Sequence, residues 1–129
     1  MIADFIAEVM TYPALISAIG AKVYPLDFPQ GCKLPAIAVR QVSGAPLMAD
    51  DGNTGLYNAR LQVDCKADSY AEAKDLADEF KTVGEAMNAA QAGFLLVELE
   101  AELDNRDAVA DGSEYPYRVT LVFNLWKGD

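Results

Sequence analysis

The residues best suited to chemistry are scarce in this 129-residue sequence. It contains no histidine, and its two cysteines, Cys32 and Cys65, lie far apart. The lack of histidine removes the commonest general base, every Ser-His or Cys-His pair and most zinc sites. No C-x-x-C, phosphate-loop, dinucleotide, zinc-protease or nucleophile-elbow motif is present. We therefore expect both cysteines to be small buried hydrophobes in a chain made in a reducing compartment.

The abundant reactive groups are carboxylates, and two clusters of them could bind a cation. The run 50–53 resembles part of a calcium loop, but the spaced ligands and the distal glutamate are missing. Asp104, Asp107 and Asp111 are spaced along one acidic segment. Carboxylates without a fixed cage bind hard cations weakly, so we interpret both clusters as solvated turns or loops.

Two further pairs of residues could be interpreted as catalytic. Asp64 stands beside Cys65, but adjacent strand residues point to opposite faces and cannot share a site. Glu98 and Glu100 could form an acid/base dyad, but we expect both on an outward face without a pocket or a polarising neighbour. The sequence therefore predicts no catalytic residue, no cofactor and no metal, and a protein that is not an enzyme.

Composition narrows the class further. Ten Lys and Arg stand against twenty Asp and Glu, which gives a net charge of −10 and disfavours both nucleic-acid readers and anionic membranes as partners. The hydrophobic fraction of 52% excludes a disordered chain. No apolar run reaches the ~20 residues of a membrane span, and the N-terminus lacks the features of a secretory signal. We expect one domain over residues 1–129.

Periodicity predicts the order helix, short strand, hairpin, helix, hairpin. Helical spacing of apolar residues favours a broken helix over 2–19, with Pro13 starting its second piece. Ser69 and Glu72 form a capping box for a long amphipathic helix over 69–92. Alternation with period two predicts four strands after a short extended piece at 23–26, and these cover 36–43, 56–66, 94–103 and 115–126.

These elements predict an α+β fold: a four-stranded antiparallel sheet with helices packed on one face, plus a short extra N-terminal strand. The last strand should insert between strands 56–66 and 94–103. Residues 44–55 are expected to form a long loop and residues 104–114 an acidic loop. In strand 94–103 we expect the apolar residues to face inward (Leu95, Val97, Leu99, Ala101 and Leu103). Glu98, Glu100 and Glu102 should face outward.

Two features indicate partner surfaces. The loop at 44–55 carries Leu47 and Met48, and long loops in compact domains tend to be functional. These two side chains either anchor the loop on a neighbour or fold back on their own core. The outward sheet face is mixed rather than uniformly charged, and it carries Gln62, Thr120, Val122, Asn124 and Trp126. Such a face suits either a protein contact or ordinary solvation.

The order of these elements and several local strings resemble one family. The strings are Val23-Tyr24-Pro25, Pro29-Gln30-Gly31 with Leu34-Pro35, Arg60-Leu61-Gln62-Val63-Asp64, Ser69-Tyr70-Ala71-Glu72-Ala73 with Leu76-Ala77, and Tyr117-Arg118-Val119 with Phe123 and Trp126. Over nearly the whole chain the sequence resembles the tail-completion, tail-terminator or tail-to-head joining proteins of long-tailed bacteriophages, prophages and gene transfer agents. One departure is Ala36-Ile37, where an aromatic residue often follows the proline.

The resemblance implies a virion structural protein at the head–tail junction, made in the host bacterial cytoplasm. It implies a ring, a hexamer, that caps the tail tube and meets the head connector or stopper protein, while DNA passes without specific binding and no membrane takes part. A glutamate stripe, Glu98, Glu100 and Glu102, could line an acidic lumen or simply protect an edge strand.

From the exposure pattern, the candidate interface residues are those of the loops and of the outward sheet face. They are Leu47, Met48, Asp50, Asp51, Gln62, Asp107, Asp111, Thr120 and Trp126. Two rival functions stay open. One is a head-completion or connector protein of the neck, and the other is a small cytoplasmic enzyme or ligand-binding α+β domain.

Overall fold

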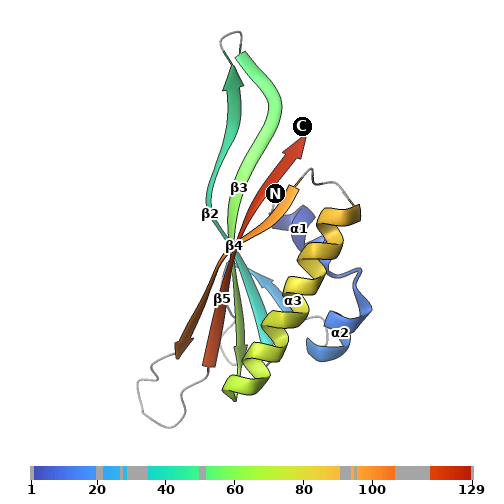
Figure 1. Cartoon of the computed structure of the whole chain (residues 1–129), viewed down its shortest axis with the longest axis vertical. Coiled ribbons are helices and arrows are strands. Elements are labelled where there is room, and N and C mark those ends of the chain that lie inside the picture. The colour runs from blue at the N-terminus through green and yellow to red at the C-terminus, as the bar shows by residue number, and fades with distance from the viewer. Residues whose placement is uncertain are drawn as a thin grey trace.

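The computed structural model describes residues 2–19, 22–26, 28, 35–49, 52–90, 94, 96–106 and 117–128. The fold is α+β, as the sequence predicts, and Figure 1 shows all three helices on one side of the sheet. The elements in chain order are α1 (Ile2–Val9), α2 (Pro13–Ile19), β1 (Val23–Pro25), β2 (Ala36–Ala49), β3 (Gly52–Ala67), α3 (Tyr70–Ala90), β4 (Leu96–Arg106) and β5 (Tyr117–Gly128).

The sheet has five strands in the order β1-β2-β3-β5-β4. The last strand lies between β3 and β4, as predicted, and these strands and β2 pair antiparallel. The expected four-stranded antiparallel sheet is wrong in one respect. β1 pairs parallel with β2, Val23 opposite Ile37, and makes the sheet mixed. Pro25 ends this short edge strand, where a residue without an N–H group is tolerated.

The hydrophobic core lies between the helices and the sheet face that they cover, which we call the inner face. Phe5 of α1, Phe80 of α3 and Phe123 of β5 are buried, and the ring centroids of Phe80 and Phe123 are 5.7 Å apart. Gly84 lets α3 approach the sheet closely, because a Cβ atom there would lie 2.8 Å from the Phe123 ring. Among the described residues, no helix is long and apolar enough to span a membrane.

The expected loop at 44–55 is wrong: residues 44–49 continue β2, and residues 52–55 begin β3. Gly44, which favoured a loop in the sequence, serves packing instead. A Cβ atom on residue 44 would lie 2.3 Å from the hydroxyl oxygen of Tyr57, so the bare backbone makes room for that ring. Gln41 Nε2 also donates to the Tyr57 hydroxyl at 3.2 Å. Backbone pairing across the hairpin therefore prevails over a composition typical of loops.

The face pattern predicted for residues 94–103 is wrong in its second half. The register shifts between Leu99, opposite Phe123, and Ala101, opposite Val122. Glu100 is the extra residue of this β-bulge, and beyond it the alternation of faces reverses. Leu103 is consequently 54% exposed, whereas Glu102 lies opposite the buried Leu121 on the inner face. β4 also runs to Arg106, so the acidic loop cannot begin at residue 104.

Candidate assembly surfaces

The most prominent feature outside the core is the β2–β3 arm, residues 42–58. β1 accompanies β2 only as far as Val39, and β5 accompanies β3 only as far as Leu56, so the end of the hairpin is two-stranded. Figure 1 shows it extending beyond the other strands at the top of the molecule. The side chains of residues 42–46 are exposed. Among the described residues of the arm, Tyr57 near its base packs against the hydrophobic core.

Part of the predicted interface lies at the tip of this arm. Leu47 and Met48 are residues of β2, and Met48 pairs with Asn53 across the hairpin. Asp50 and Asp51 fall in the connection between the strands and lie outside the described residues. Asp107 and Asp111 lie outside the described residues as well. The structure thus puts the predicted apolar pair on a projecting strand hairpin rather than on a loop.

A second candidate surface is the outer face of the sheet, opposite the helices. Gln62 of β3 and Thr120 of β5 meet here around Asp64, a residue that the sequence analysis considered only as a neighbour of Cys65. The Thr120 hydroxyl donates to Asp64 Oδ1 at 2.8 Å, and Gln62 Nε2 donates to the same oxygen at 3.2 Å. Asp64 and Thr120 are 7% and 4% exposed. These bonds satisfy a carboxylate that would otherwise be costly to bury.

Trp126 lies farther along the same face, opposite Asn58 of β3 and Leu96 of β4. It is half-buried. Asn58 Nδ2 donates to Asn124 Oδ1 at 2.7 Å and to the carbonyl oxygen of Leu125 at 2.9 Å. The predicted sheet residues therefore share one face, but they do not form one cluster.

The predicted stripe of three glutamates is divided between the two faces. Glu98 lies opposite Asn124 on the outer face, and Glu100 pairs there with Arg60, Oε2 to Nε, at 2.8 Å. Glu102 points instead toward α3. Its carboxylate oxygens lie 2.7 Å from Lys74 Nζ and 2.9 Å from Lys81 Nζ. The expectation that Glu98, Glu100 and Glu102 face outward together is wrong, because the bulge at Glu100 reverses the alternation.

The two lysines of α3 form an ion-pair network with β4 that the sequence analysis missed. Lys74 Nζ also lies 2.9 Å from Asp104 Oδ1, and the Tyr70 hydroxyl donates to Asp104 Oδ2 at 2.9 Å. Hydrogen bonds from Lys74 and Lys81 lower the pKa of Glu102, and hydrogen bonds from Lys74 and Tyr70 lower the pKa of Asp104. The network depends on the bulge at Glu100, which places Glu102 and Asp104 on the face toward α3. Nothing in the residue pattern marks that bulge, so the sequence did not predict the network.

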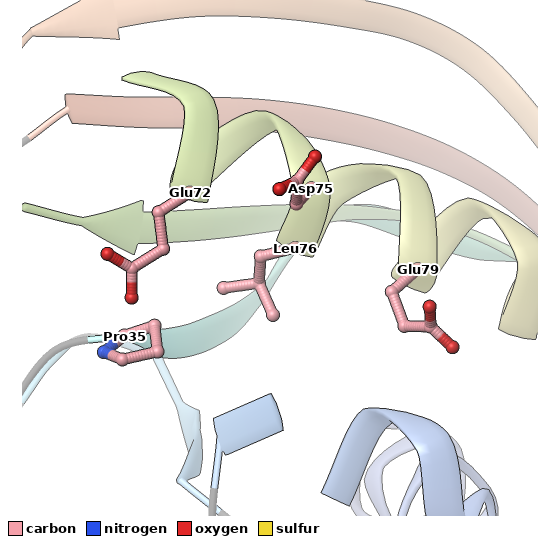
Figure 2. Close-up of a pocket in the computed structure, with 5 residues that line it drawn as sticks. All are labelled: Pro35, Glu72, Asp75, Leu76 and Glu79. Carbon is pink, nitrogen blue, oxygen red and sulfur yellow. The ribbon is translucent and has the colours of Figure 1, made fainter. Parts of the chain in front are cut away.

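A shallow pocket of about 200 Å³ opens beside α3 and is lined by Pro35, Glu72, Asp75, Leu76 and Glu79. Figure 2 shows Glu72 and Glu79 on either side of Leu76, with Pro35 below Glu72. The described residues of the lining supply carboxylates and apolar groups. It thus offers an acidic, partly apolar surface for contact.

Of the two cysteines, Cys65 is fully buried on the inner face, and Cys32 lies outside the described residues. Burial, with lesser effects from Asp64 and Glu102, raises the pKa of the Cys65 thiol. The thiolate is the reactive form of cysteine, so Cys65 acts as a small hydrophobe, as predicted. In the described part of the chain, no group of three or more Cys, Asp or Glu residues is placed to hold a metal ion.

Comparison with known proteins decides the family. The family model for tail completion protein gp17 matches residues 4–127. The chain belongs to this family of tail-completion proteins. The resemblance seen in the sequence is therefore confirmed, and this tail-completion protein is a structural component of a phage-type virion.

The fold of this tail-completion protein also occurs in a solved particle. A chain from the virion of a native gene transfer agent particle is 21% identical, with a TM-score of 0.64. The match covers 95% of the present chain and 90% of that chain. At this identity the likeness shows a common fold. The curated proteins contain no match.

Proposed function

We propose that this tail-completion protein forms a ring at the head–tail junction, most simply a hexamer, which ends the tail tube and joins it to the head. The observation that carries this proposal is the family match over residues 4–127. The fold of a chain in a gene transfer agent virion supports it. The role is one of assembly, and no catalytic residue takes part.

The β2–β3 arm is the device that we assign to docking on the last ring of the tail tube protein. It carries Leu47 and Met48 near its tip, beyond the strands that support the sheet. A projecting hairpin can enter a neighbouring ring, where apolar residues at its tip would be buried. The opposite end of the ring would then meet the head connector or stopper protein. A net charge of −10 suits a passage through which DNA moves without binding.

The test is electron microscopy of tails assembled with and without this protein. We expect tails of uniform length that join heads only when it is present. Unchanged tails together with leaking heads would instead identify a head-completion or connector protein of the neck. Unchanged tails and intact heads would contradict any role at the junction.

The arm is tested by replacing Leu47 and Met48 together with alanine. We expect the variant to fold and to lose at least tenfold in the fraction of tails that join heads. Leu26→Ala is the matched control, because this leucine is 66% exposed and lies after β1, away from the arm. Normal tail length and normal head joining in the Leu47/Met48 variant would remove the arm from the proposal.

A further inference from the structure

Charge is distributed unevenly between the two sides of the molecule. Four of the basic side chains lie on the outer face of the sheet, Arg40, Arg60, Lys66 and Arg118, as their alternation with buried residues requires. In the described part of the chain, Arg40 is exposed and forms no ion pair. β4 adds two exposed apolar residues to the same face, Ala101 and Leu103, and Leu103 is 54% exposed. The same face carries three carboxylates, namely the buried Asp64, Glu100 paired with Arg60, and the exposed Glu98. Its described residues are therefore nearly balanced in charge, and Arg40 is an exposed cation among them that forms no ion pair.

The side of α3 that points away from the sheet is acidic instead. Glu72, Asp75, Glu79 and Glu85 lie along it and form no ion pair with a described residue. The two lysines of the helix do not offset these charges, because Lys74 and Lys81 are held by Glu102 and Asp104 of β4. Leu76 and Pro35 form the apolar floor of the shallow pocket between the acids (Figure 2).

The edges of the sheet are poorly suited to joining copies strand to strand. The free part of β2 carries a register shift between Gln41 and Ser43, and Pro46 follows it. The other edge strand, β4, carries the bulge at Glu100 and exposed carboxylates. Bulges, prolines and charges are devices that prevent edge-to-edge pairing. Contact between faces is therefore the better route to assembly.

We propose that the outer sheet face of one copy receives the acidic side of α3 of a second copy. Arg40 on the outer face would meet the carboxylates of α3 that form no ion pair with a described residue. The exposed Leu103 and Ala101 on one side and the partly exposed Pro35 on the other would be covered together. Two different surfaces meet, so the contact is heterologous and can repeat around a closed ring. This inference rests on the proposed ring and names the surfaces that form it.

The first test uses charge reversal in the purified full-length chain. Arg40→Glu and Glu79→Lys should each weaken self-association at least tenfold in sedimentation velocity. An equimolar mixture of the two variants should restore it, because the unaltered α3 of one variant meets the unaltered sheet face of the other and the swapped charges attract. Arg40→Lys and Glu8→Lys, on α1, are the matched controls and should associate normally. Association that survives both reversals would overturn the proposal.

The second test examines assembled tails, and so also covers a chain that associates only there. With Cys32→Ser as background, Arg40→Cys and Glu79→Cys are combined and treated with a short bis-maleimide. Within one copy the sheet and α3 separate the two positions, so a link joins neighbouring copies. We expect a ladder of linked species, absent when Glu8→Cys replaces Glu79→Cys.

The outcomes separate this inference from the function on which it rests. Rings seen on the tails without a link between positions 40 and 79 would overturn the proposed surfaces and leave the ring intact. A single copy per tail, or no copy at all, would contradict the proposed function itself. If Arg40→Glu left self-association normal but abolished binding to tails, the outer face would belong to the tail tube protein, and the inference would be wrong.

Discussion

The inner face of the sheet buries Leu61, Leu121 and Phe123 under three helices, whereas the outer face leaves Arg40 and Leu103 exposed. Both faces are built from the same strands, residue by alternate residue. The two faces therefore contribute differently to the stability of the fold. Removal of apolar surface from water stabilises the fold on the inner face, and the outer face can carry charge and exposed leucine without loss of the core.

The same contrast between an outward and an inward position occurs within the single strand β4. Before its bulge Glu98 is exposed, and after it Glu102 bonds two lysines of α3. Because of the one extra residue, Glu102 points toward α3 instead of outward, and its ion pairs connect the edge strand to the helix. Bulges act in this way because the added residue changes which face the following side chains occupy.

The largest effect should come from removing an aromatic ring from the inner face. Phe123→Ala leaves a cavity beside Phe5 and Phe80, whose ring centroids lie 6.3 and 5.7 Å from that of Phe123. We expect a loss of about 3–5 kcal/mol in the free energy of unfolding, measured by urea denaturation. Val122→Ala, the next residue and on the outer face, is the control and should lose less than about 1 kcal/mol. Equal losses would mean that the two faces do not differ in this way.

A smaller effect is expected where α3 approaches the sheet. Gly84→Ala should destabilise by about 1–3 kcal/mol, because the added Cβ would lie 2.8 Å from the buried ring of Phe123. In an exposed helix the same change would stabilise by about 1 kcal/mol. Thermal or urea denaturation shows whether Gly84→Ala lowers or raises the free energy of unfolding, and so whether the close approach of α3 to the sheet is required. A stabilised Gly84→Ala protein would show that α3 can move away from the sheet without loss.

The spacing of apolar residues was enough to predict the helices and the four long strands, and the position of β5 between its neighbours was predicted from the split arrangement that makes these strands antiparallel. The spacing failed where a single residue changes the register, at Glu100, and where glycine serves packing, at Gly44 beneath Tyr57. Neither feature can be recognised from composition or local periodicity, because each depends on what lies across the sheet. For the same reason the sequence predicted an interface at Leu47 and Met48 but described the arm that carries them as a loop.

The smallest effect is expected from replacing carboxylates in the two halves of β4, before and after the bulge. Glu102→Gln should lower the free energy of unfolding at pH 7 by about 1 kcal/mol, because a partly exposed network of two lysines contributes little more than one surface pair. Glu98→Gln, on the same strand but the outer face, should change it by less than about 0.5 kcal/mol. Urea denaturation of the three proteins at several pH values measures both differences.

The pH dependence of the free energy of unfolding distinguishes the loss of these ion pairs from a packing defect. Lys74 and Lys81 lower the pKa of Glu102 below its ordinary value of 4.5. The folded state therefore binds this proton less readily than the unfolded state, and the stabilisation is fully present above pH 4.5. It is lost as the pH falls from 4.5 through the lowered pKa. The difference between the wild-type protein and Glu102→Gln should accordingly shrink toward zero in acid. A difference that is as large at pH 3 as at pH 7 would assign the effect to packing and not to the ion pairs between α3 and β4.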